Sequence, residues 1–138
     1  MGRRRPPAII AVDTSALVAI AFDEPERPAF VDIVTRADGA LVSTVSAVET
    51  RMVVHARRGQ RAVILLDDLL RLPPFRSVAP EVAEMDAAYA AFVSFGRGSG
   101  HPARLNFGDV FSYALAKVRG IPLLFKGGDF GLTDLECM

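Results

Sequence analysis

Short apolar runs alternate with longer stretches of helical periodicity along this chain. Residues 8–12 are apolar and rich in β-branched side chains, which is typical of a strand buried on both faces of a parallel sheet. Three further runs predict strands, the middle one more weakly than the others: 40–43, 75–78 and 121–125. The intervening stretches predict helices at 16–22, 26–36, from a cap at Thr44 or Ser46 to about 58, and at 61–72, 80–95 and 105–117. This alternation predicts right-handed crossovers and a parallel sheet covered by helices on both faces.

The helix predicted at 105–117 is apolar on nearly every side, so it must be buried in the protein. It carries one carboxylate near its start, Asp109, on the same face as Tyr113 and Ala116. An unpaired carboxylate would be expensive to desolvate there. Either the positive end of the helix dipole or a bound cation must therefore compensate its charge.

Three other carboxylates occupy similar positions. Asp13 directly follows the first strand, Asp129 follows the fourth, and Glu49 interrupts an apolar stripe one turn into the helix after the second. Read singly, Asp13 and Asp129 are ordinary residues at the junction of a strand and a helix. The carboxyl ends of parallel strands, however, meet at one edge of the sheet, where ligands bind. Four carboxylates at that edge would repel one another, which predicts a hard divalent cation, Mg²⁺ or Mn²⁺.

Composition narrows the class of function. The 16 basic and 16 acidic residues cancel, so a polyanion would have to be gripped locally. The single cysteine, Cys137, has no partner for a disulfide, which fits a reducing compartment such as the cytoplasm. No segment is long enough to span a membrane, and neither His55 nor His101 is spaced for zinc. One or two ions held by carboxylates suit the attack of water on a phosphodiester.

Four motifs give the chain a family resemblance. They lie at 12–17, 46–49, 107–116 and 125–130 and read V-D-T-S-A-L, S-A-V-E, F-G-D-V-F-S-Y-A-L-A and F-K-G-G-D-F. In this order and at these spacings they resemble the motifs of PIN-domain ribonucleases, and specifically those of the VapC toxin of a VapBC toxin–antitoxin pair. The similarity runs from about residue 9 to residue 134.

The resemblance implies a three-layer α/β/α fold with a short parallel sheet, in a single domain over residues 1–138 with 1–7 as a flexible tail. It implies a cytoplasmic endoribonuclease that depends on Mg²⁺ or Mn²⁺. The acidic residues of the family map onto Asp13, Glu49, Asp109 and Asp129. The family's hydroxyl near the metal maps onto Thr14 and Ser15, which the residue pattern alone reads as caps of the first helix.

The resemblance also implies partners. VapC toxins form homodimers and are inhibited by a VapB-like antitoxin, which wraps apolar clefts and places a basic side chain among the carboxylates. Contact with DNA is expected only through that antitoxin, and none with a membrane. The RNA substrate is expected to meet basic side chains near the site, namely Arg97, His101, Arg104 and Lys126.

Two features depart from the family pattern. Gly128 stands where relatives often have Asn or Asp, so a supporting ligand is missing there. The sequence also stops soon after Asp134, where relatives commonly add a fifth strand, so we expect that edge strand to be short, absent or supplied by a partner.

Two other functions fit part of the sequence. A phosphohydrolase resembling the haloacid dehalogenases would use Asp13 as its nucleophile, but that group has a second Asp where Ser15 stands. It also leaves Glu49 and Asp109 without a role. The other alternative is a degenerate PIN fold that serves only as a binding module.

Overall fold

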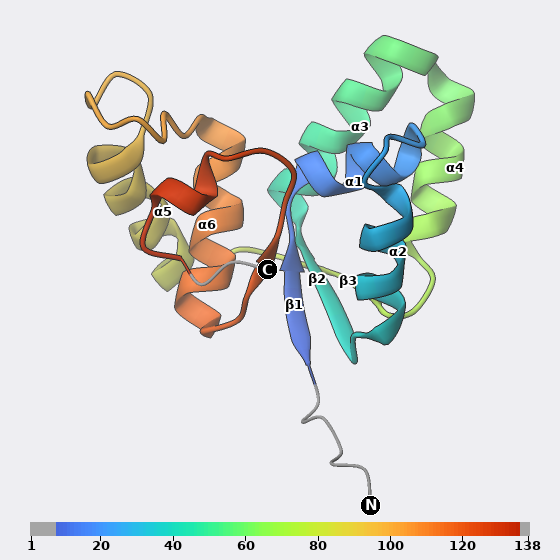
Figure 1. The fold of residues 1–138 in the computed structure, drawn as a ribbon, viewed down its shortest axis with the longest axis horizontal. Coiled ribbons are helices and arrows are strands. Elements are labelled where there is room, and N and C mark those ends of the chain that lie inside the picture. The colour runs from blue at the N-terminus through green and yellow to red at the C-terminus, as the bar shows by residue number, and fades with distance from the viewer. Residues whose placement is uncertain (1–7, 136–138) are drawn as a thin grey trace, which may run out of the picture.

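The computed structural model describes residues 8–135 and contains a four-stranded parallel sheet between two layers of helices (Figure 1). The strands are β1 (Ile9–Val12), β2 (Gly39–Ser43), β3 (Phe75–Val78) and β4 (Leu123–Leu124). They lie in the order β3-β2-β1-β4, and every neighbouring pair is parallel. The tail expected at 1–7 and Cys137 lie outside the described residues.

Each connection between successive strands contains two helices. They are α1 (Thr14–Ala21) and α2 (Arg27–Arg36), α3 (Thr44–Arg58) and α4 (Gln60–Leu70), and α5 (Val82–Phe95) and α6 (Phe107–Arg119). A short 3₁₀ helix, η1 (Phe130–Leu132), follows β4. No helix within residues 8–135 combines the length and the apolar character needed to cross a bilayer.

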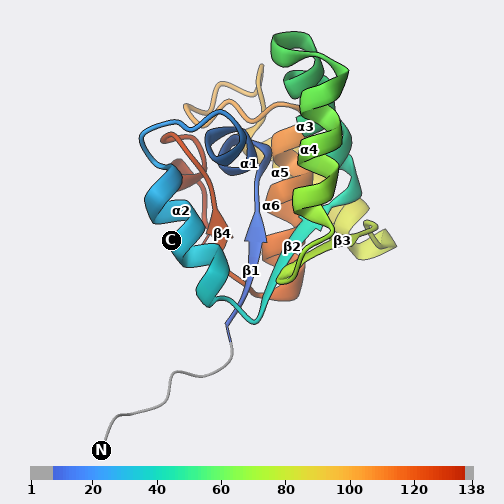
Figure 2. The ribbon, with the colours of Figure 1, turned by 90° about the vertical axis from the view of Figure 1, so that its right-hand side faces the viewer.

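The two faces of the sheet bury different sets of residues, which confirms the three-layer architecture. Ile10 and Val12 of β1 pack among residues of α1 and α2, whereas Ala11 between them packs among residues of α5 and α6. Figure 1 shows α5 and α6 on one side of the strands and α1 to α4 on the other. Figure 2 shows that the α3–α4 pair extends beyond the carboxyl ends of the strands.

Helix α6 is buried along most of its length, as its apolar sequence predicts. Its residues from Val110 to Ala116 are buried, except that Phe111 is partly exposed. At its far end, Arg119 Nε donates to Oε1 of Glu84, a buried residue of α5, at 3.1 Å. This ion pair and the apolar contacts between α5 and α6 fix the helix that carries Asp109.

Several details differ from the elements predicted from sequence. Asp13 itself caps α1, through Oδ2 and the N–H of Ser15, and Ser43 caps α3 in place of Thr44 or Ser46. Strand β4 has only two residues, because β1 turns into α1 at Asp13 and leaves Phe125 without a partner strand. No fifth strand follows it within the described residues.

Candidate functional site

The four candidate carboxylates surround the carboxyl ends of β1 and β4. Asp13 follows β1 and Asp129 follows β4, and these two strands are neighbours in the sheet. From β1 the chain continues to β2 and β3 on one side, and it then returns to place β4 on the other side of β1. Such a switch point leaves a crevice where ligands bind in open α/β sheets. Glu49 enters the same region from α3, and Asp109 enters it from the first turn of α6.

The pKa of Asp109 depends on the charges of the other three candidate carboxylates. The pKa of its carboxyl is raised from the ordinary 3.8 to about 6, chiefly by burial. The hydrogen bond from the Asn106 backbone lowers this pKa, and the negative charges of Asp13, Glu49 and Asp129 add to the rise. All three charges are therefore close enough to disfavour ionisation of Asp109.

Asp13 presents an unpaired oxygen to this region. The residue is only 2% exposed, and its Oδ2 accepts a hydrogen bond of 2.9 Å from the N–H of Ser15. Its Oδ1 is buried and has no hydrogen-bond partner in the described structure. A buried carboxylate oxygen without a partner is costly, and a cation beside it would remove that cost.

Glu49 approaches the first turn of α6 because residue 108 is glycine. A Cβ atom on Gly108 would overlap the carboxylate group of Glu49, including both of its oxygens. The missing side chain therefore lets α3 bring a carboxylate directly onto the N-terminal turn of α6, where the helix dipole favours negative charge. Gly108 was not among the residues predicted to form the site.

Asp109 has a structural task as well as its place among the carboxylates. Its Oδ2 accepts from the N–H of Asn106 at 2.9 Å, and Oδ1 of Asn106 accepts from the N–H of Asp109 at the same distance. This reciprocal capping box begins α6. An Asn three residues before an acidic residue is a pattern that the sequence displays, so Asn106 could have been recognised from it.

Asp129 lies in an exposed loop that is anchored on both sides. Before it, the N–H of Lys126 donates to Oγ of Ser15 at 2.9 Å, and after it Phe130 is buried against Phe125. A Cβ on Gly128 would meet no atom within 4 Å, so a side chain such as Asn or Asp would have room there.

The two hydroxyls predicted near the metal make other contacts, and neither caps α1. Thr14 Oγ1 donates to the carbonyl of Ser46 at 3.1 Å, which joins α1 to α3. Ser15 Oγ accepts from the backbone of Lys126, which joins α1 to the loop of Asp129. Both hydroxyls therefore connect segments that carry candidate carboxylates.

The four basic residues predicted to meet RNA are in different situations. Arg97 and Arg104 are exposed in the loop between α5 and α6. His101 organises that loop, since its Nδ1 accepts from the N–H of Ala103 at 3.0 Å. Lys126 Nζ forms ion pairs with Glu24 at 3.1 Å and Glu26 at 3.3 Å, two partners that sequence analysis missed.

The carboxylate oxygens of the candidate site fit a hard cation, although the four side chains do not converge on one point in this structure. Among residues 8–135, no three Asp, Glu, His or Cys side chains are already arranged as ligands of one metal ion. One oxygen each of Asp13 and Asp109 is turned toward a backbone N–H. Carboxylate oxygens without His or Cys are the ligands that Mg²⁺ and Mn²⁺ prefer, and the unpaired Oδ1 of Asp13 offers such a ligand.

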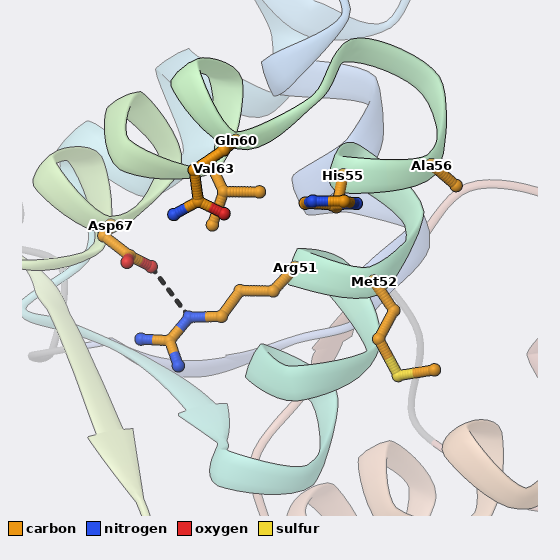
Figure 3. A pocket seen from close by; sticks show the side chains of 7 residues that line it. All are labelled: Arg51, Met52, His55, Ala56, Gln60, Val63 and Asp67. Atoms are coloured by element: carbon orange, nitrogen blue, oxygen red, sulfur yellow. Dashed lines mark hydrogen bonds and ion pairs between the residues drawn. The ribbon is translucent and has the colours of Figure 1, made fainter.

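A separate groove lies between α3 and α4 and contains none of the four carboxylates (Figure 3). Arg51 Nε donates to Oδ1 of Asp67 across it at 2.8 Å. The groove is also lined by His55, Met52, Ala56, Gln60 and Val63. The groove is therefore distinct from the candidate metal site.

Comparison with known proteins gives the family. The model of the PIN domain family matches residues 10–134. Ribonuclease VapC28 of Mycobacterium tuberculosis is 46% identical over 127 residues, which cover 91% of this chain and 94% of that protein. Ribonuclease VapC of Mycolicibacterium smegmatis is 44% identical over 129 residues, covering 94% of this chain and 99% of that one. The chain therefore belongs to the PIN-domain family, and within it to the VapC proteins.

Solved structures agree on the fold. The crystal structure of Mycobacterium tuberculosis VapC20, described as a Sarcin-Ricin loop cleaving toxin, matches with a TM-score of 0.75 at 21% identity, over 92% of this chain and 96% of that chain. VapBC2 from Rickettsia felis, bound to a DNA fragment from its promoter, matches with a TM-score of 0.74 at 11% identity, over 94% and 97%. None of these matches supports a haloacid-dehalogenase-like phosphohydrolase.

The raised pKa of Asp109 predicts how an Asp109→Asn variant responds to pH without metal. The folded protein holds this proton more tightly than the unfolded chain, so the free energy of unfolding of the wild type should fall as the pH rises from about 4 to about 6. Asn carries no charge and can still accept from Asn106. At pH 7.5 the variant should be more stable by about 0.5–2 kcal/mol, since solvent screens part of the effect.

Denaturant unfolding at pH 4 and pH 7.5 measures this difference, which should shrink at the lower pH. Added Mg²⁺ should stabilise the wild type more than the variant, because only binding to the folded state contributes. A variant that is less stable at both pH values, with an unchanged Mg²⁺ response, would leave Asp109 with its capping role alone.

Proposed function

We propose that the protein is the toxin of a type II toxin–antitoxin pair and hydrolyses RNA phosphodiester bonds with Mg²⁺ or Mn²⁺. One observation carries the proposal: at the switch point of the sheet, the negative charges of Asp13, Glu49 and Asp129 contribute to the raised pKa of Asp109. The relatives that match over most of the chain are named ribonucleases. Acting on RNA would place the toxin in the cytoplasm.

The proposed mechanism assigns a task to each part of the site. Asp13, Glu49, Asp109 and Asp129 would hold the ion. A bound Mg²⁺ or Mn²⁺ would supply an acidified water and neutralise charge on the phosphate. Because Gly108 has no side chain, the Glu49 carboxylate can lie against the first turn of α6. Because the Oδ1 of Asp13 has no competing partner, this oxygen is free to serve as a ligand.

RNA would enter along the basic loop between α5 and α6. Arg97, His101 and Arg104 would contact the RNA backbone there, as phosphate contacts position a nucleic acid without reading its sequence. Lys126 would have to break its ion pairs with Glu24 and Glu26 before it could contact a phosphate. We therefore expect Lys126 to contribute less than the loop residues.

Metal-dependent cleavage tests the activity. The purified protein should cut single-stranded or looped RNA with Mg²⁺ or Mn²⁺ and stop in excess EDTA, and Asp13→Asn should lower the rate by about 10²-fold or more. Asp68→Asn is the matched control, because Asp68 is exposed on α4 and pairs with the exposed Arg71. Expression without a partner should arrest bacterial growth, and Asp13→Asn should relieve the arrest.

Cleavage that persists in EDTA contradicts the mechanism. A protein that binds the metal but cuts no RNA favours the alternative of a binding module.

A VapB-like antitoxin would occupy an apolar groove on the α1 to α4 side of the sheet. Apolar residues of α1, α2 and α4, among them Ile20, Val31 and Leu65, line it. Three arginines also line it, Arg27, Arg58 and Arg61, so we expect an antitoxin segment that combines apolar and acidic side chains. Solved VapBC complexes that share this fold support the assignment of a partner of this class.

Leu65→Glu should weaken antitoxin binding by at least about 10-fold, because it places a charge in the apolar groove. Leu65 is 66% exposed in the free protein, so the substitution should leave the fold and the RNA cleavage intact. Val118→Glu on α6 is the control, since Val118 is also exposed and lies outside the groove. Titration calorimetry with the antitoxin encoded beside the gene measures both. Equal affinities for the two variants would place the antitoxin elsewhere.

The homodimer would form through α5, which is apolar on two faces. One face, with Ala88 and Ala91, is buried against α6. The other carries five apolar residues that are at least half exposed: Val82, Met85, Tyr89, Phe92 and Val93. An exposed apolar stripe of this length is typical of an interface, and a two-fold axis would pair the stripe with itself.

Introducing charge into this stripe tests the dimer. Tyr89→Glu combined with Val93→Glu should convert a dimer into a monomer, because two-fold symmetry places four new charges in one interface. Sedimentation velocity at several concentrations measures the mass, and Ser94→Glu, also exposed on α5, serves as the control. A wild type that stays monomeric at high concentration contradicts the proposal.

A further inference from the structure

We infer that four buried hydroxyl groups are positioning residues for the carboxylate site, a step that rests on the proposed function. They belong to Thr14, Ser46, Thr50 and Ser112, and none of these residues is more than 8% exposed. Each lies within three positions of a candidate carboxylate in the sequence. Through them the helices that carry Asp13, Glu49 and Asp109 are hydrogen-bonded to one another.

The first connection joins α1 to α3. Thr14 Oγ1 donates to the carbonyl of Ser46 at 3.1 Å, and Thr50 Oγ1 donates to the same carbonyl at 2.7 Å. The two threonine hydroxyls also lie 3.2 Å apart, so the single proton of Thr50 Oγ1 can be donated to Thr14 Oγ1 instead of to the carbonyl. Thr14 directly follows Asp13, and Thr50 directly follows Glu49. One small cluster therefore fixes the two carboxylate-bearing helices relative to each other.

The second connection joins α3 to α6. The hydroxyls of Ser46 and Ser112 are 3.1 Å apart and both are buried. Ser46 precedes Glu49 by three residues, and Ser112 follows Asp109 by three, so each serine lies about one helical turn from its carboxylate. A shift of α6 along α3 would separate the two hydroxyls and would displace Asp109 from Glu49.

The chemistry of these positions supports positioning over simple packing. They belong to α1, α3 and α6, whose other buried residues are mostly apolar, such as Leu17 and Val110, and a core built for stability alone would carry Ala or Val in their place. Apolar side chains tolerate sliding, whereas a satisfied hydroxyl network specifies one arrangement. Like charges on the three helices push them apart, so directional bonds between the helices oppose that repulsion directly.

A matched pair of variants at Thr50 tests this inference. Thr50→Val keeps the shape of the side chain and removes the hydroxyl, whereas Thr50→Ser keeps the hydroxyl. A third variant, Ser46→Ala with Ser112→Ala, removes both members of one bond and leaves no unpaired group. The probe is Mn²⁺ alone, titrated into the folded protein by calorimetry, and RNA cleavage is measured beside it as kcat and KM.

Thr50→Val and the double variant should bind Mn²⁺ about 10-fold more weakly than the wild type, the size of effect seen when groups that orient metal ligands are lost. Thr50→Ser should bind it nearly as the wild type does. At fixed, subsaturating Mn²⁺ the loss should fall on kcat, and excess Mn²⁺ should restore part of it. Val63→Ala controls for general destabilisation, because Val63 packs with Val54 and Leu66 in a separate cluster, and its Mn²⁺ affinity should not change.

The outcomes separate the inference from the function beneath it. If the wild type binds Mn²⁺ and cuts RNA, while Thr50→Val and the double variant bind Mn²⁺ with unchanged affinity, the hydroxyls do not position the site. If Val63→Ala weakens Mn²⁺ binding as much as Thr50→Val does, the effect is one of stability, and the inference also fails. A wild type that binds no Mn²⁺ overturns both this inference and the proposed metal-dependent activity.

Discussion

Repulsion among four carboxylates at one edge of a small sheet is the constraint that the surrounding structure has to meet. Two of the four accept a hydrogen bond from a backbone N–H group, Asp13 from Ser15 and Asp109 from Asn106. The N-terminal turn of α6 faces Glu49, and this contact exists only because Gly108 has no side chain. The site is thus held by local donors, while the apolar cores on both faces of the sheet supply the stability that its charges remove.

Sequence patterns predicted the strands and the layers because each depends on local order, and the candidate site of four carboxylates is a prediction from the same order. Apolar runs define strands, and parallel strands end at the same edge, so residues that follow them meet. The hydroxyl contacts could not be predicted in this way, since they join residues 32 and 66 positions apart through the packing of helices. The ion pairs of Lys126 with Glu24 and Glu26 depend on the same packing, as does the second apolar face of α5. Asn106 was an omission, because its capping pattern is visible in the sequence.

The arrangement of the helices separates the surfaces to which we assign partners. The apolar groove is formed by α1 to α4, on one side of the sheet, and the exposed stripe of α5 lies on the other (Figure 1). The carboxylates lie between them, at the end of the strands. A second copy and an antitoxin would therefore not compete for the same side chains, and inhibition would not require the dimer to dissociate.

The shortness of the edge strands determines how a partner can recognise this protein. Strand β4 has two residues and β3 has four, so the sheet offers little free backbone for an added strand. Backbone pairing is indifferent to most side chains, whereas helix surfaces such as those around Leu65 and Tyr89 are read side chain by side chain. A bacterium that encodes several toxins of this fold could thus keep each one matched to its own antitoxin, because discrimination would depend on residues that differ between copies rather than on a shared sheet edge.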